Sequence, residues 1–185
     1  MILPVIAYGH PVLKKVCEEI TPEYENLSVL LGNMWETMYN AKGVGLAAPQ
    51  IGKPIRIFLV DTVQLEKDDA PGIKKTFINA QIIEEDGAFW TYEEGCLSIP
   101  KLVGDVERQE RVTIRYVDED FKEHLETFEG MDARVIQHEY DHIEGVLFTQ
   151  KLKPLKRRLI SRKLENIKKG KIDTDYKMKF VVYRL

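Results

Sequence analysis

The feature that most restricts the fold of this chain is the hexapeptide at residues 137–142, in which two histidines flank a glutamate in the pattern H-E-x-x-H. On an α-helix, side chains four residues apart are separated by only about 40° around the axis, so His138 and His142 can bind one metal ion. In this pattern Glu139 is not a ligand; it takes a proton from a metal-bound water. Apolar residues on both sides predict a buried helix over about residues 132–145.

A catalytic metal site of this kind uses a third protein ligand, which must come from elsewhere in the chain. The metzincin pattern is excluded, because Phe148 stands where its third histidine belongs, although the expected Gly145 is present. Two candidates remain. Glu165 on a later predicted helix would give a peptidase-like set of ligands. Cys96 is favoured, since the adjacent Gly95 allows the backbone to come close to another group.

The remaining histidines and the second cysteine are not expected to bind the metal. His10 precedes Pro11 in a turn-like segment and is predicted to lie at the surface. His124 falls at the edge of the predicted sheet and is expected to be half-exposed. Cys17 is predicted to pack in the interior. Two cysteines do not form a disulfide framework, and a thiolate at Cys96 suits a reducing compartment.

Three segments together resemble the signature motifs of the peptide deformylase family, in the family's order and at similar spacing. They are residues 43–50 (GVGLAAPQ), residues 94–98 (EGCLS) and the helix that carries the two histidines. The resemblance implies a hydrolase that removes the N-formyl group from the formylmethionine of nascent polypeptides and releases formate. It further implies metal ligands at Cys96, His138 and His142, an acid/base at Glu139, and polarisation of the formyl oxygen by Gln50 and the Leu97 N–H.

The metal itself is not determined by these ligands, because two imidazoles and one thiolate suit zinc, iron(II), cobalt or nickel. The order of affinities favours zinc over iron. The resemblance implies Fe²⁺, with Zn²⁺, Ni²⁺ or Co²⁺ as substitutes. A thiolate beside an open coordination position also predicts sensitivity to oxygen.

The substrate pocket is expected to combine a cramped formyl site with an apolar pocket for the methionine side chain. The cramped part is assigned to Gly45 and its neighbour Leu46. Glu94, Arg108 and Asp141 are expected to orient the metal ligands. Lys101 follows the cysteine motif where the family often has an arginine, and lacks the guanidinium fork. The predicted substrate-binding residues are Val44, Tyr92, Glu94, Met131 and Val135.

Several classes of function are disfavoured. The glycine-rich residues 43–52 lack the lysine and Ser/Thr of a phosphate-binding P-loop. A net charge of −3 does not fit a protein that binds DNA through its overall charge. The N-terminal apolar residues are interrupted by Pro4, Gly9 and Pro11, so neither a signal peptide nor a membrane span is predicted. We therefore expect a cytoplasmic protein.

The predicted fold class is α+β, with antiparallel strands packed around a central helix that carries the H-E-x-x-H motif. Residues 1–185 are expected to form a single catalytic domain. Thr21 and Pro22 predict the start of a helix that runs to about Ala41. Strands are predicted at residues 55–60, 76–83, 88–92, 112–117 and 124–128, with an exposed loop at 66–72 and a hairpin turn at 118–122.

The C-terminal part is a basic helix and tail over residues 151–185. Residues 151–171 contain ten Lys or Arg against one acid, while leucines and isoleucines keep helical spacing. One face is predicted to pack and the other to be solvated. Because deformylases act on nascent chains, the basic face is also a candidate contact with ribosomal RNA. The residues at helical spacing are Leu155, Leu159, Ile160, Leu164 and Ile167.

Two other functions remain open. A metallopeptidase would use Glu165 in place of Cys96 and cleave internal peptide bonds. A non-catalytic binding module would hold its metal with four protein ligands and leave no position for water.

Overall fold

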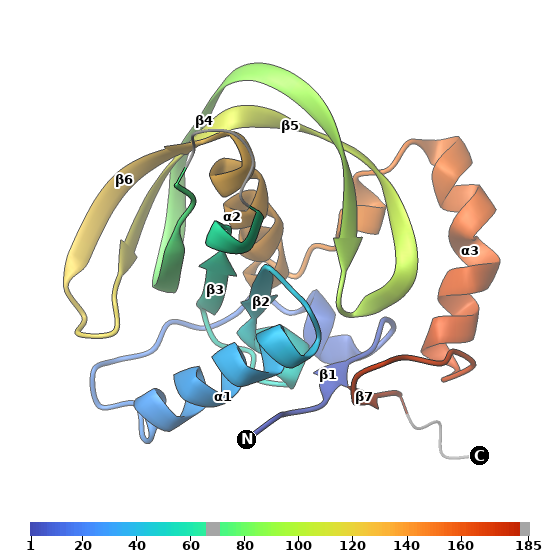
Figure 1. Cartoon of the computed structure of the whole chain (residues 1–185), viewed down its shortest axis with the longest axis horizontal. Helices are drawn as coiled ribbons and strands as arrows, with labels where there is room; N and C mark the ends of the chain where they lie inside the picture. Colours follow the sequence, from blue (N-terminus) through green and yellow to red (C-terminus); the bar gives the residue numbers. More distant parts are fainter. Residues whose placement is uncertain (66–70, 182–185) are drawn as a thin grey trace.

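The computed structural model describes residues 1–65 and 71–181 of the chain. Its main sheet is antiparallel, with the strand order β2-β3-β4-β5-β6, and a two-stranded parallel sheet pairs β1 with β7 (Figure 1). The strands are β1 (Val5–Ile6), β2 (Gly45–Ala47), β3 (Ile57–Asp61), β4 (Lys74–Cys96), β5 (Ile99–Val117), β6 (Glu123–Glu129) and β7 (Met178–Lys179).

Three α-helices lie in the described residues: α1 (Leu27–Asn40), α2 (Gly130–Ile143) and α3 (Pro154–Lys168). Short 3-10 helices span Pro11–Lys14, Ala48–Ile51, Val63–Leu65 and Phe148–Gln150. None of the helices in residues 1–65 and 71–181 has both the length and the apolar character that crossing a bilayer requires.

Strands β4 and β5 are unusually long and bend over α2 as an arch (Figure 1). Their pairing shifts register at four places, and bulges of this kind bend a strand and increase its twist. Asn79 and Gly87, at two of these shifts, have φ values of 52° and 81°. The sequence pattern predicted separate strands at residues 76–83 and 88–92. That was wrong, because the bulges bend β4 without ending it.

Helix α2 packs inside the arch against β2, β3, β5 and β6. Its apolar face, which includes Ala133, Ile136 and Ile143, joins one buried cluster with the sheet residues Phe58 and Phe77. The rings of Phe58 and Phe77 stack with their centroids 4.8 Å apart. The predicted α+β class, with antiparallel strands around the helix of the H-E-x-x-H motif, is confirmed.

Helix α1 begins five residues later than the Pro22 predicted as its first helical residue. The Tyr24 N–H donates to the Thr21 carbonyl at 3.0 Å, so Pro22 lies in a β-turn, a position that proline also favours. Asn26 then adopts a left-handed conformation, which interrupts any continuous helix. One face of the helix still packs in the core, since Leu31, Met34 and Met38 are buried.

Helix α3 buries Ile160, Leu164 and Ile167 in a cluster with residues of β5. Leu155 and Leu159 are 71% and 69% exposed, so only part of the predicted apolar set faces the protein. The separation of four and three residues places the buried trio on one face, whereas Leu155 and Leu159 lie outside it.

The two predicted connections have different outcomes. The hairpin turn at 118–122 is confirmed, because the Asp118 N–H donates to the Lys122 carbonyl at 3.1 Å between β5 and β6. The loop predicted at 66–72 falls largely on residues 66–70, which lie outside the described part of the chain; Pro71 is exposed and Gly72 is half-buried.

Candidate active site

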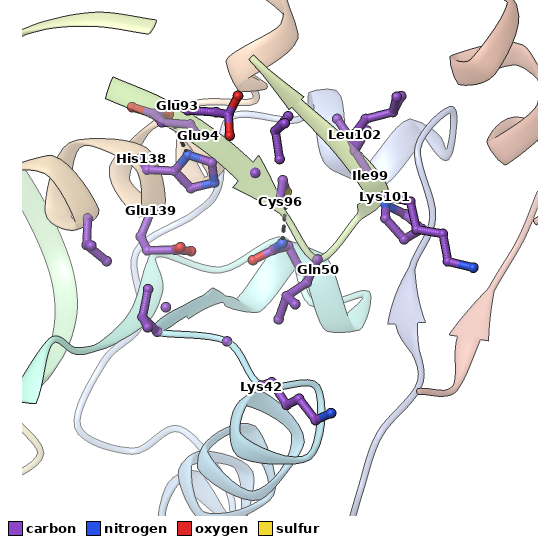
Figure 2. Close-up of a pocket in the computed structure, with 18 of the residues that line it drawn as sticks. Lys42, Gln50, Glu93, Glu94, Cys96, Ile99, Lys101, Leu102, His138 and Glu139 are labelled. Atoms are coloured by element: carbon purple, nitrogen blue, oxygen red, sulfur yellow. Dashed lines mark hydrogen bonds and ion pairs between the residues drawn. The ribbon is translucent and has the colours of Figure 1, made fainter. Parts of the chain in front are cut away.

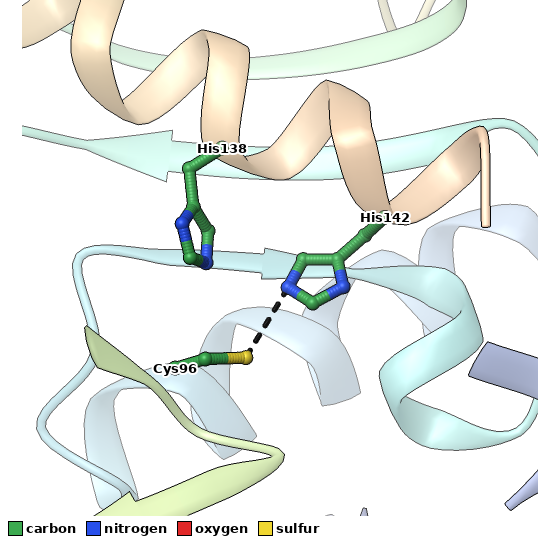
Figure 3. A group of neighbouring side chains, drawn as sticks. All are labelled: Cys96, His138 and His142. Carbon is green, nitrogen blue, oxygen red and sulfur yellow. Dashed lines mark hydrogen bonds between the residues drawn. The ribbon is translucent and has the colours of Figure 1, made fainter. Parts of the chain in front are cut away.

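Three potential metal ligands meet between α2 and the end of β4 (Figure 3). His138 and His142 project from successive turns of α2, and Cys96 is the last residue of β4. One ligand atom from each residue lies within 4.8 Å of the others, and Cys96 Sγ is 3.3 Å from His142 Nε2. The structure therefore brings together the three residues that the family resemblance selects.

Cys96 is placed by a tight hairpin. Cys96 pairs with Ile99, which leaves Leu97 and Ser98 as a two-residue loop between β4 and β5. A Cβ at Gly95 would come no nearer than 3.4 Å to another side chain, and Gly95 lines the cavity, so the close approach predicted there stays a prediction. The pairing of β4 with β5 shifts register between residues 95 and 96.

The orientation of His138 is set by Glu94. The Glu94 Oε2 atom is 2.8 Å from His138 Nδ1, so that ring nitrogen is occupied and Nε2 remains for a metal. Arg108 binds Glu94 through two contacts of 2.7 and 3.1 Å, and Arg134 Nη1 donates to it at 3.0 Å. Burial opposes charge on Glu94, but hydrogen bonds to His138 and Arg108 hold its pKa well below the ordinary range.

The predicted orienting pair, Arg108 and Asp141, is also in place. Arg108 Nη1 donates to Asp141 Oδ2 at 2.8 Å, so one guanidinium connects β5 to α2 and to Glu94. Glu94 lines the cavity described below, yet its carboxylate is engaged by these neighbours, which makes it a support for His138 more than a contact for substrate.

Arg134 is a site residue that the sequence analysis missed. It is 2% exposed, and its guanidinium donates to Glu94 and to the carbonyls of Val106 and Trp90. Its guanidinium carbon lies 4.3 Å from the centre of the Trp90 ring. The available signal was its position four residues before His138, which places both side chains on the same face of α2.

Glu139 is buried beside the glycine of β2. A Cβ on Gly45 would lie 2.4 Å from Glu139 Oε1, so only glycine fits there without displacing the carboxylate. The other oxygen, Oε2, has no hydrogen-bond partner among the described residues. Burial raises the pKa of Glu139 to about 7, against a lowering by His138. A carboxylate with a free lone pair and this pKa can exchange a proton near neutral pH.

Gln50 approaches the same centre from the 3-10 helix Ala48–Ile51 (Figure 2). Its Oε1 accepts the Ala47 N–H at 2.9 Å, so its amide NH₂ faces the site. Nε2 donates to Cys96 Sγ at 3.4 Å and to Ser98 Oγ at 3.2 Å. The contact with Ser98 is at the long end of the N–H···O range and sulfur is a weak acceptor, so a substrate oxygen can replace both contacts.

A cavity of about 440 Å³ opens beside these groups (Figure 2). Lys42 and Lys101 line it, and both have left-handed backbones, with φ values of 57° and 60°. Tyr92 is 41% exposed. Of the predicted site residues, Val44, Gly45, Gln50, Tyr92, Glu94, Cys96, Leu97, Met131, Val135, His138 and Glu139 line the cavity.

The residues predicted to stay out of the site do so. His10 Nδ1 accepts the Val12 N–H at 3.2 Å, and His124 Nε2 lies 2.6 Å from Asp118 Oδ2. Cys17 is buried in the core, as predicted.

The peptidase-like ligand set with Glu165 is ruled out. Its carboxylate pairs with Lys169 at 3.2 Å on α3 and does not join the ligand group.

The donor set fits a divalent transition metal. One thiolate and two imidazoles are the ligands that such ions accept. Burial lowers the pKa of His142 well below its ordinary value, which favours the neutral imidazole that a metal ligand needs. Burial also opposes charge on His138, but its hydrogen bonds to Cys96 and Glu94 raise its pKa, so metal binding at this ring would release a proton. The group found in the described residues has three members, the number typical of catalytic sites, which speaks against a closed four-ligand binding module.

Comparisons with known proteins agree with this geometry. A model of the polypeptide deformylase family matches residues 2–158. Proteins named peptide deformylase from Flavobacterium johnsoniae and Christiangramia forsetii are 57% and 56% identical, each alignment covering 97% of this chain and 96% of the relative. A crystal structure of a peptide deformylase from Legionella pneumophila is similar with a TM-score of 0.81 and 37% identity, covering 92% of this chain and 98% of that one.

Proposed function

The chain belongs to the polypeptide deformylase family, the enzymes that remove the N-formyl group from nascent peptides, and we propose that it does so as a metal-dependent hydrolase that releases formate. One observation carries the proposal. The three-ligand group lies beside a buried glutamate with an unpaired oxygen, at the inner end of a cavity large enough for a methionine side chain.

Cys96, His138 and His142 are the proposed ligands. The ion that they would hold supplies Lewis acidity, which lowers the pKa of a coordinated water towards about 7. Glu94 keeps the His138 ring in position through Nδ1, and Arg108 keeps Glu94 charged.

Glu139 is the proposed general base and acid. Its Oε2 atom is free to accept a proton from the attacking water, because no described residue occupies it. The same carboxyl then returns the proton to the leaving amine, which produces formate and a free N-terminus.

Gln50 and the backbone N–H of Leu97 are the proposed donors to the oxygen of the formyl group. Negative charge develops on this oxygen as the carbonyl is attacked, so donors aimed at it stabilise the transition state more than the substrate. Gln50 suits this role because its orientation is fixed by Ala47 and it carries no charge.

Selectivity for the formyl group is assigned to Gly45 and Glu139. A formyl carbon carries only hydrogen where other acyl groups carry carbon. The contact between Gly45 and the glutamate leaves this part of the site tight. The methionine side chain is assigned to the part of the cavity lined by Val44, Met131 and Val135, with Tyr92 at its exposed edge.

The function is tested by release of formate from formyl-Met-Ala. Acetyl-Met-Ala serves as the matched control, since it adds one methyl group at the position that Gly45 restricts. We expect turnover of the formyl peptide and at least about 100-fold less of the acetyl peptide. Cleavage of unformylated peptides, or no formate release after metal loading, would reject the proposal.

Iron(II) is the proposed metal. Metal-free protein is reconstituted without oxygen with Fe²⁺, Zn²⁺, Ni²⁺ or Co²⁺, and formate release is followed before and after exposure to air. We expect the ferrous protein to be active and to lose activity in air, because oxygen can attack both the metal and the Cys96 sulfur. Zinc is expected to bind well and turn over more slowly, while nickel and cobalt keep their activity in air. Equal rates for zinc and iron, without oxygen sensitivity, would contradict this assignment and leave the deformylase proposal intact.

We also propose that residues 1–185 form a single catalytic domain, with residues 151–185 as its basic C-terminal helix and tail, and that the outer face of α3 binds ribosomal RNA. Arg158, Arg162 and Lys163 are exposed there. Reversing these three charges should reduce co-sedimentation with ribosomes and weaken its dependence on salt, while formate release is unchanged. Unaltered co-sedimentation would reject the ribosome contact.

The need for a reduced Cys96 supports a cytoplasmic location.

A further inference from the structure

The C-terminal tail reaches the hairpin that carries Cys96. The Tyr176 hydroxyl donates to the carbonyl of Leu97 at 2.7 Å. Thr174, Asp175 and Tyr176 also line the cavity. All three residues lie beyond residue 158, where the match to the family model ends. The tail therefore forms part of the site wall.

The tail is itself anchored. Strand β7 pairs with β1, so the Val5 N–H donates to the Lys177 carbonyl and the Ala7 N–H to the Lys179 carbonyl, both at 2.9 Å (Figure 1). Thr174 Oγ1 donates to the Tyr176 carbonyl at 2.8 Å. These contacts hold the backbone at Tyr176 and just after it, which keeps the side chain within reach of Leu97.

The hairpin needs such outside contacts because its loop contains only Leu97 and Ser98. The Ser98 carbonyl accepts the Tyr8 N–H at 2.8 Å, and Ser98 Oγ accepts from Gln50. At Leu97 the hydroxyl of Tyr176 holds the carbonyl. The Leu97 carbonyl and the Leu97 N–H belong to two successive peptide planes that meet at one Cα atom. Because Cys96 pairs with Ile99, the loop is closed at both ends, so fixing the plane of the carbonyl narrows the orientations open to the plane of the N–H.

We propose that Tyr176 is a positioning residue for deformylation: through the Leu97 carbonyl it holds the Leu97 N–H in the orientation that binds the oxygen of the formyl group. The proposal rests on the proposed function. Loss of this positioning should lower kcat more than it changes KM, because the Leu97 N–H is a donor that matters most in the transition state.

Tyr176→Phe removes only the hydroxyl and keeps the ring that packs at the cavity wall. We expect kcat for formyl-Met-Ala to fall about threefold to tenfold, the range for loss of one hydrogen bond, with KM within twofold of wild type. Metal content should stay unchanged, and loss of one hydrogen bond should lower the melting temperature by no more than about 6 °C. Hydrogen exchange in a peptide covering residues 94–100 should become faster.

Tyr116→Phe is the matched control. Tyr116 is a buried tyrosine on β5 whose hydroxyl contacts Glu126 and, at 3.1 Å, Lys75, away from the hairpin. We expect the Tyr116→Phe variant to have the kcat, the KM and the hydrogen exchange at residues 94–100 of the wild type.

The outcomes separate the hypotheses. If wild type releases no formate, the proposed function fails and Tyr176 has no reaction to position. If wild type is active, three results overturn the inference: kcat of Tyr176→Phe within twofold of wild type, an increase confined to KM, or a fall in kcat that parallels lost metal or a fall in melting temperature larger than one hydrogen bond explains. A fall in kcat alone, with faster exchange at the hairpin, supports it.

Discussion

Replacing Glu139 with glutamine is expected to lower kcat by about 10²-fold to 10⁴-fold while metal content stays at the wild-type level. The amide has nearly the shape of the carboxylate but cannot accept the proton of the attacking water. Glutamate at this position carries an unpaired buried oxygen, so its neutral replacement removes the cost of burying a charge. The melting temperature should therefore remain equal or rise slightly.

The measurements are formate release under saturating substrate, metal stoichiometry and thermal unfolding. Glu139→Ala is a second variant, which also removes the contact with Gly45. Glu129→Gln is the control, since Glu129 is an exposed glutamate at the start of the same helix. Loss of metal from Glu139→Gln would make Glu139 a ligand, and a kcat within tenfold of wild type would remove it from the chemistry.

Replacing Cys96 with alanine is expected to remove metal and activity together. Changes to residues that only support metal ligands typically cost 10-fold to 100-fold in affinity, so loss of a ligand should weaken binding by more than about 100-fold. His138 and His142 remain on α2, but two imidazoles alone do not make the three-ligand site that the structure presents.

Cys17→Ala provides the comparison, because it removes the same sulfur from a buried position in the core. It should cost about 1 kcal/mol of stability and leave metal binding intact. Metal titration of both variants, followed by formate release at each occupancy, separates the two sulfurs. Full occupancy of Cys96→Ala would show that another residue is the third ligand.

Much of this protein could be predicted from local patterns. The helix of His138 and His142 depends on periodicity within 14 residues, and the predicted span of 132–145 differs from Gly130–Ile143 by two residues at each end. The family motifs selected Cys96, Gln50 and Leu97, and the cavity brings these together. Such predictions succeed because each depends on residues that are neighbours in the chain or on a known combination of motifs.

Predictions from local sequence patterns failed at the start of α1 and in the middle of β4. Proline suits both the first turn of a helix and a β-turn, so Pro22 by itself did not decide between them. Similarly, the charged and glycine-containing residues between 83 and 88 indicated the end of one strand and the start of another. Pairing with β5 along the whole length kept them in one strand and converted the break into bulges.

The sequence by itself determined the helix that carries His138, Glu139 and His142 and the residue types that it presents, because periodicity and residue type act over a few residues. Tertiary structure decided which distant groups complete it. From residue types alone, both Glu165 and Cys96 could be the third ligand. Only the path of β4 brings the Cys96 sulfur within 4.8 Å of the histidine nitrogens. Arg134 contacts Glu94 across 40 residues of chain, and Tyr176 contacts Leu97 across 79. Both contacts depend on strand pairing and packing, and a local sequence pattern does not predict which residues meet over such separations.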